Sequence, residues 1–268
     1  IQRQDISDPD IIREFALKVG DLVHLDYLLM LTVADVNATN PTLWTSWKAQ
    51  LMRQLYTETK RMLRRGLENP VDKNEWIEET QQQALQKLEQ KGFAEKEVRK
   101  LWEGRTEDYF LRESVTDIEW HTEAIAHHAN PDEPLILIRD PQQSAFEGAT
   151  QIFVRMRAHN HAFAAVVTLL DQLNLNIQDA RLYSSSGEFT NDTYYVLNEN
   201  LEPIGNDDER RTQIWQTLHD ELAHNIDNFP SIAQRRTARE LKHFTMPTRT
   251  SMANDIRSGS TMLEVILP

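Results

Sequence analysis

Three pairs of residues carry side chains that could chelate a metal or share a proton. They are the adjacent His127-His128, the spaced His159 and His161, and the neighbouring His219-Asp220. Adjacent helical residues point to different sides, and His219-Asp220 falls late in an amphipathic helical pattern. The spacing of His159 and His161 suits chelation, but no third ligand is evident. We therefore interpret these pairs as structural or solvated.

The familiar motifs of catalysis and nucleotide binding are absent. The sequence contains no HExxH, GxSxG, GxxxxGK[ST] or GxGxxG, which excludes the common zinc-protease, hydrolase, P-loop and dinucleotide signatures. The residues alone show no complete catalytic site.

Asp35 is a carboxylate within the otherwise apolar helical stretch Leu31–Val36. A buried carboxylate must be paired, hydrogen-bonded or bound to a metal. Two interpretations stay open: a metal ligand, or an exposed aspartate on the polar side of its helix.

Composition limits the partners. The chain has 268 residues, with 29 Lys and Arg against 42 Asp and Glu, giving a formal charge of −13. This acidity argues against a nucleic-acid partner. The absence of Cys excludes disulfides and thiolate metal sites. No apolar run is long enough for a bilayer, and no secretory signal is present, so we expect a cytoplasmic protein without a membrane partner. A start without Met suggests a piece of a longer protein.

The first 130 residues have a helical period. The sequence Ser7-Asp8-Pro9-Asp10 is a helix start signal, and apolar residues at helical spacing continue to Val23. A break is expected at Lys91-Gly92. Further helices are predicted over residues 27–40, from 42 to about 63, 74–110 and 114–128.

The second half changes to strand periodicity. The order strand, helix, strand, strand, helix predicts a ferredoxin-like βαββαβ unit, so the fold class is α+β. A short strand at Leu135–Ile138 precedes it, and His243–Met246 is expected to supply its fourth strand. The predicted elements are strands at 151–157, 177–184, 192–198 and 261–267, and helices at 163–173 and 207–222.

One long stretch is specific to a known family. Residues 31–41 read LTVADVNATNP, followed by LWTSWK at 43–48, LYTET at 55–59 and RRGL at 64–67. These segments resemble the bacterial bifunctional PII uridylyltransferase/uridylyl-removing enzymes. The segment from 150 to about 225 is similar to the first of that family's two C-terminal ACT domains.

The resemblance implies a domain plan and an activity. Residues 1–130 would be the end of an HD hydrolase domain and following helices, 131–149 a linker with a short strand, 150–250 the first ACT domain and 251–268 the start of the second. Enzymes of this family attach UMP from UTP to the PII signalling protein, remove it by HD hydrolysis, and sense glutamine at ACT domains that can pair.

Two sets of site residues follow from the resemblance. Asp35 matches the last HD metal ligand, for Mg²⁺ or Mn²⁺ in the full-length enzyme; its partner ligands precede this chain, so we expect the chain alone to hold no metal and to be inactive. Asn160, Asn176 and Asp179 are the expected effector ligands, because the turn at 158–163 offers free amides to a carboxylate. The alternative is that Asn160 only caps the helix and Asn176 only ends it.

Two other functions remain open. Enzymes that make or degrade guanosine tetraphosphate also combine HD and ACT domains, and a non-enzymatic amino-acid-binding regulator would share the second half. Residues upstream of Ile1 would separate these alternatives.

Overall fold

The computed structural model describes residues 6, 9–39, 44, 46–65, 73–141, 148–183, 188–224, 226, 249–255 and 260–266. The chain divides into two compact units, Ile1–Ser231 and Ile232–Pro268. Each unit is described by itself.

The first three helices are α1 (Pro9–Val19), α2 (Leu22–Thr39) and α3 (Ser46–Arg65). The helix expected to continue to Val23 ends earlier, at Gly20. Gly20 has a φ of 85°, a left-handed conformation that glycine adopts without steric cost. Helices α1 and α3 pack together through Ile12, Ala16, Leu55 and Met62.

The next four helices are α4 (Lys73–Gln90), α5 (Glu95–Trp102), α6 (Glu107–Arg112) and α7 (Val115–His127). The expected break near Gly92 is confirmed, and a second break at Gly104 was not predicted; both glycines have positive φ. Helix α7 begins at a capping box formed by Ser114 and Asp117.

A four-stranded antiparallel sheet follows, in the order β1-β2-β4-β3. Its strands are β1 (Leu135–Arg139), β2 (Thr150–Arg157), β3 (Asn176–Tyr183) and β4 (Phe189–Leu197). Helix α8 (Ala162–Gln172) joins β2 to β3, which run parallel because both pair antiparallel with β4. This is a split βαβ unit, and the predicted α+β class is confirmed.

Strand β1 has a larger role than the expected strand within a linker. It pairs antiparallel with β2 from Leu135↔Arg155 to Arg139↔Gln151, at the edge where a βαββαβ unit places its last strand. Ile136 is buried in the core beneath α9 (Asp208–His224). The burial of this side chain stabilises β1 at the edge of the sheet. The fourth strand expected at 243–246 lies outside the described residues.

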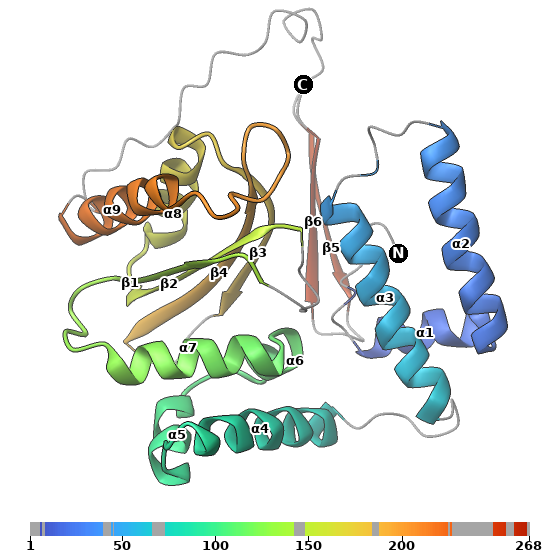
Figure 1. Cartoon of the computed structure of the whole chain (residues 1–268), viewed down its shortest axis with the longest axis horizontal. Coiled ribbons are helices and arrows are strands. Elements are labelled where there is room, and N and C mark those ends of the chain that lie inside the picture. The colour runs from blue at the N-terminus through green and yellow to red at the C-terminus, as the bar shows by residue number, and fades with distance from the viewer. Residues whose placement is uncertain are drawn as a thin grey trace, which may run out of the picture. The chain divides into compact units, whose positions relative to one another are not determined.

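Helices cover both faces of the sheet (Figure 1). Helices α8 and α9 lie on one face, where Ile152 and Val154 of β2 join Leu169 and Leu218 in the main core. Helices α6 and α7 lie on the other face, against the alternate β2 residues such as Phe153. The period of two along β2 therefore separates an apolar face from a face that carries polar groups.

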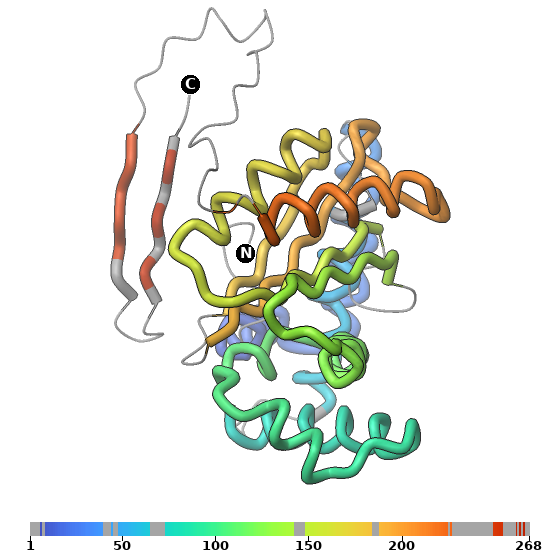
Figure 2. The backbone as a smooth tube through the Cα atoms, turned by 90° about the vertical axis from the view of Figure 1, so that its left-hand side faces the viewer, coloured from blue at the N-terminus to red at the C-terminus, as the bar shows by residue number. Residues whose placement is uncertain are grey.

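The second unit contains a hairpin of β5 (Arg249–Asp255) and β6 (Ser260–Ile266), visible as two neighbouring strands in Figure 2. The predicted strand at 261–267 corresponds to β6, whereas β5 was not predicted.

None of the described helices combines the length and apolarity that crossing a membrane requires.

Candidate regulatory interface between helices and sheet

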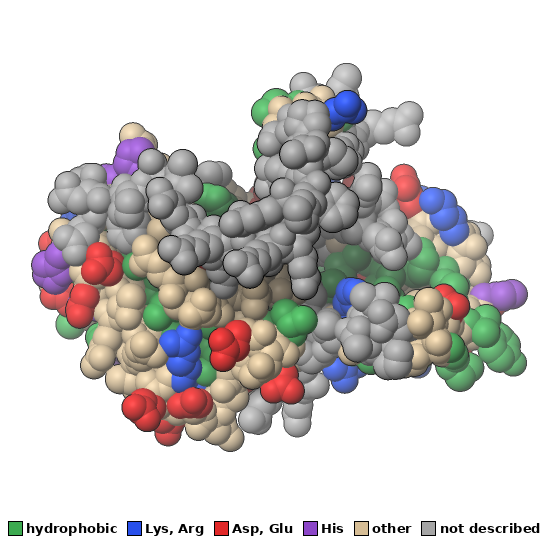
Figure 3. Space-filling view, turned by 90° about the horizontal axis from the view of Figure 1, so that it is seen from above, with side chains coloured by type: hydrophobic (Ala, Val, Ile, Leu, Met, Phe, Trp, Pro, Cys, Tyr) green, Lys and Arg blue, Asp and Glu red, His purple; other side chains and the backbone are tan. Residues whose placement is uncertain are grey.

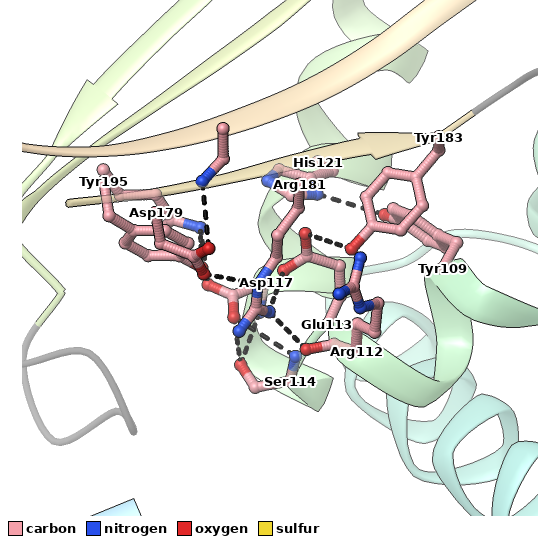
Figure 4. Close-up of polar contacts among 12 residues, drawn as sticks. Tyr109, Arg112, Glu113, Ser114, Asp117, His121, Asp179, Arg181, Tyr183 and Tyr195 are labelled. Atoms are coloured by element: carbon pink, nitrogen blue, oxygen red, sulfur yellow. Dashed lines mark hydrogen bonds and ion pairs between the residues drawn. The ribbon is translucent and has the colours of Figure 1, made fainter. Parts of the chain in front are cut away.

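Polar side chains gather where α6 and α7 meet the sheet. Figure 4 shows them reaching toward one another from the two helices and from β3 and β4. Most are almost fully inaccessible to solvent. Buried polar groups must find partners inside the protein, and these find them across the interface.

The first cluster is centred on Arg181 of β3. Its guanidinium lies 3.3 Å from Glu113 Oε2 and also donates to the backbone carbonyl of Arg112. Tyr183 donates its hydroxyl proton to Glu113 Oε1 at 2.7 Å. Burial raises the pKa of Glu113, and the positive charge of Arg181 opposes that rise. The pair thus fixes the end of α6 to β3.

The second cluster is centred on Asp117 of α7. Its Oδ2 accepts from the Ser114 backbone N–H at 3.2 Å, and its own backbone N–H donates to Ser114 Oγ at 3.1 Å, which together cap the helix. Its Oδ1 accepts from Gln151 Nε2 at 3.1 Å and from the guanidinium of Arg139. One carboxylate therefore holds the start of α7 and also reaches strands β1 and β2.

Gln151 and Arg139 extend the second cluster. Gln151 Nε2 also donates to the Tyr195 hydroxyl at 3.3 Å, which connects β4. The guanidinium of Arg139 donates from Nε to Gln151 Oε1 at 2.9 Å and lies 3.8 Å from the ring centroid of Trp120. Each charge is shared among several partners, as buried charge requires.

His121 of α7 completes the interface. Its ring stacks on Phe153 of β2, with centroids 3.9 Å apart, and its Nδ1 lies 3.1 Å from the Tyr109 hydroxyl. Burial, and then the charges of three nearby arginines, hold the pKa of His121 well below its usual value. The imidazole is therefore neutral at physiological pH.

This arrangement is suited to mechanical coupling rather than to chemistry. The carboxylates of Glu113 and Asp117 are engaged by cations and hydrogen-bond donors, and both residues are buried. A displacement of β2, β3 or β4 would break several charge-assisted hydrogen bonds unless α6 and α7 moved with it. These contacts therefore attach α6 and α7 to the sheet.

Asp35 lies on α2 and is exposed to solvent. The described residues contain no group of three or more His, Cys, Asp or Glu able to hold a metal ion. A single exposed carboxylate does not fit a divalent metal site by itself. The assignment of Asp35 as a metal ligand stays a prediction about a longer protein.

The expected effector residues lie at different places. Asn160 is exposed in the turn before α8, whereas Asn176 begins β3 after that helix and donates from Nδ2 to the Asn198 carbonyl at 2.9 Å. Asp179 Oδ2 lies 3.4 Å from Arg181 Nε. Asn160 and Asn176 therefore do not meet within this chain, since α8 separates them. The predicted helix start near Ala162 is confirmed, with His161 rather than Asn160 at the N-cap.

The histidine pairs make local contacts. His159 Nδ1 accepts from the His161 backbone N–H at 3.2 Å, and His127 Nδ1 lies 2.8 Å from the Glu123 carbonyl. His219 stacks on Trp215 with ring centroids 4.7 Å apart.

The buried cluster itself was missed by sequence reasoning. Only the Ser114-x-x-Asp117 spacing gave a detectable local signal, that of a capping box. Glu113 and Arg181 are separated by 68 positions, so their pairing has no local pattern.

The fold thus defines an α+β protein with a split βαβ sheet and a helical layer attached to it. A family model described as the uridylyltransferase GlnD fifth domain matches residues 72–124. This range contains α4, α5, α6 and all but the last residues of α7. No solved structure matches the chain significantly.

Bifunctional uridylyltransferase/uridylyl-removing enzymes match the chain over its whole length. The enzyme of Stutzerimonas stutzeri is 51% identical over 267 residues, that of Pseudomonas aeruginosa 50% and that of Pseudomonas putida 49%. The match covers 100% of this chain and 30% of each relative. The chain is homologous to the C-terminal part of these enzymes.

Proposed function

We propose that this chain is the regulatory C-terminal part of a cytoplasmic enzyme that attaches UMP from UTP to a PII signalling protein and removes it by metal-dependent hydrolysis. Glutamine bound at ACT domains would control the two activities. One observation carries the proposal. About half of the residues, over the whole chain, are identical to those of relatives whose names include both reactions.

The surface of α2 supports a larger parent protein. Leu25 is its buried residue, while Val23, Tyr27, Met30 and Leu31 are each more than half exposed. Hydrophobic side chains gather over this helix at the right-hand end of Figure 3. Val23, Tyr27, Met30 and Leu31 follow one another at helical spacing and so share a face, and an exposed apolar patch of this kind commonly marks an interaction surface. We infer that further protein covers α2 in the parent enzyme.

The family's divalent metal would supply an activated water and neutralise phosphoryl charge during UMP removal. From this chain, Asp35 would contribute one carboxylate ligand. Because Asp35 alone does not form a site, no step of the hydrolysis is assigned to the described residues.

The polar interface supports a route for regulation. Effector binding that moves a strand of the sheet would be passed to α6 and α7 through Asp117, Glu113 and Arg181, since these residues join the two layers. Packed layers tend to shift between discrete arrangements rather than deform gradually. The helices would then carry the change toward the catalytic part of the parent enzyme.

The test uses the full-length enzyme and measures UMP attachment and removal with and without glutamine. Arg139→Gln weakens the contact with Asp117 while leaving Glu113–Arg181 in place. We expect both basal activities to persist and the glutamine response to fall several-fold. Arg99→Gln, on the exposed side of α5, is the matched control. An unchanged glutamine response in a folded Arg139→Gln enzyme would contradict the proposed route.

If the full-length protein neither attaches nor removes UMP from PII, the proposed activity itself is wrong. This outcome is distinct from the previous one, because basal activity and its control by glutamine are measured separately.

A further inference from the structure

A small cavity of about 100 Å³ lies between the α5–α6 connection and the sheet. The side chains that give it its character are Arg105, Thr106 and Tyr109 from the helical side, and Arg155, Phe189 and Asn191 from the sheet. Tyr183, which also lines the cavity, donates to Glu113, so the cavity borders the ion pair of Glu113 and Arg181.

Two arginines line this cavity without an acidic partner among the described residues. The guanidinium of Arg155, which is half-buried, lies 4.1 Å from the ring centroid of Phe189. The guanidinium of Arg105 lies 4.3 Å from the ring centroid of Tyr109. By contrast, the nearby Arg157 pairs with Asp132 at 2.6 Å and with Glu188 at 3.4 Å.

Within the part of the chain that the structure describes, several polar atoms at this cavity have no hydrogen-bond partner. They are Arg105 Nη1 and the Thr106 hydroxyl, which can donate to an anion, and Asn191 Oδ1, which can only accept; each atom is buried. Leaving such atoms unsatisfied costs free energy, more so for a charged group. Burial, and then the charge of Arg105, lower the pKa of Arg155 to about 10. The free donors of Arg105 and Thr106 and the two guanidinium charges favour an anion as the ligand of this cavity.

The volume of the cavity and the charges that line it indicate which anion it can hold. The volume corresponds to roughly three water molecules, enough for one carboxylate or phosphate group but too small to enclose a nucleotide. The cavity is also lined by Glu103 and Glu188, whose negative charges disfavour a dianion. Guanidinium groups form strong paired hydrogen bonds to a carboxylate.

We propose that Arg105 and Arg155 form a binding site for the carboxylate group of a small molecule, with the Thr106 hydroxyl supplying a further hydrogen bond. The site stands on these contacts alone and does not depend on the proposed enzymatic activity.

The experiment titrates the 268-residue chain with acetate and follows the arginine side-chain Nε–H signals by NMR, at ionic strength held constant with chloride. Acetamide, the neutral analogue, and inorganic phosphate are the comparison probes. We expect saturable shifts with acetate, none with acetamide, and weaker binding of phosphate. Arg155→Gln or Arg105→Gln should weaken acetate binding about tenfold or more, because a hydrogen bond to a charged group is lost. Arg99→Gln should bind as the wild type does.

Stability in the absence of acetate gives a second measurement. Arg155→Gln removes an unpaired cation, so its melting temperature should equal or exceed that of the wild type. A lower melting temperature together with unchanged acetate binding would show that Arg155 is only a packing residue. Absence of saturable acetate binding, or tighter binding of phosphate than of acetate, would overturn the proposal. If Arg155→Gln fails to fold, Arg105→Gln decides the question by the same measurements.

Discussion

The carboxylate of Glu113 lies 3.3 Å from the guanidinium of Arg181, although 68 positions separate the two residues in the chain. Both side chains are almost completely buried. Arg181 belongs to β3 and Glu113 follows the last residue of α6, so the pair joins the helical layer directly to the sheet.

Glu113→Ala should destabilise the protein by about 3–5 kcal/mol, because it removes the fully buried carboxylate that faces Arg181 and leaves only the less buried Asp179 to pair with it. Urea unfolding followed by circular dichroism measures the loss. The double variant Glu113→Leu/Arg181→Leu removes both charges and should be markedly more stable than Glu113→Ala. If the double variant is no more stable than Glu113→Ala, the ion pair does not explain the effect.

His121 should make the protein sensitive to acid. Its pKa is lowered in the folded state, so below about pH 6.5 the unfolded state binds more protons and stability falls as pH falls. The slope from this residue is about 1.4 kcal/mol per pH unit. In His121→Gln this contribution should disappear between pH 6.5 and 5. His127→Gln, with an exposed ring on the same helix, should keep the wild-type slope, and equal slopes in all three proteins would contradict the prediction.

Asp192 of β4 should make the stability of the protein fall as pH rises, the opposite of the effect of His121. Burial raises its pKa to about 6, and the hydrogen bond from the Tyr183 backbone only partly opposes this. The folded state therefore binds the proton more tightly, and stability declines as pH rises from about 4 to 6. Asp192→Asn should stabilise the protein at pH 8 by up to about 3 kcal/mol, but not at pH 3.5. The exposed Asp220→Asn is the control in thermal unfolding at both pH values, and a gain that does not depend on pH would count against this account.

The proposed function predicts that Asp35→Ala in the full-length enzyme abolishes UMP removal and leaves UMP attachment largely intact, because it would remove a metal ligand of the hydrolase site alone. Both rates should be measured with Mn²⁺ or Mg²⁺ present. The exposed Asp21→Ala, near the start of α2, is a suitable control. Removal at the wild-type rate by Asp35→Ala would exclude it as a metal ligand.

Asn160→Ala should weaken glutamine binding to the full-length enzyme without lowering its stability, because Asn160 is exposed. Asn176→Ala should also cost about 1 kcal/mol of stability, since its hydrogen bond to Asn198 is lost. Calorimetry with glutamine and thermal unfolding separate the two effects. Wild-type affinity in Asn160→Ala, Asn176→Ala and Asp179→Ala would show that the effector ligands are other residues.

The sequence by itself determined most of the local elements. Helical spacing placed α3, α4, α7, α8 and α9, and alternation placed β2 and β3, because amphipathic periodicity records which face of an element is buried. Strand β1 was predicted from a short apolar run between prolines. The family motif around Asp35 predicted the relationship that the relatives then showed. Local patterns did not predict the helix ends at Gly20 and Gly104. At both positions the apolar spacing continues in the sequence although the backbone turns.

Only the tertiary structure decided which polar residues meet. The pairing of β1 with β2, the ion pair of Glu113 with Arg181, and the cavity between Arg105 and Arg155 all join segments distant in sequence. A buried arginine in a strand has the same local pattern as an exposed one, because its partner is fixed by the packing of layers and not by its neighbours in the chain. The structure likewise separated Asn160 from Asn176, since a helix of 11 residues stands between them.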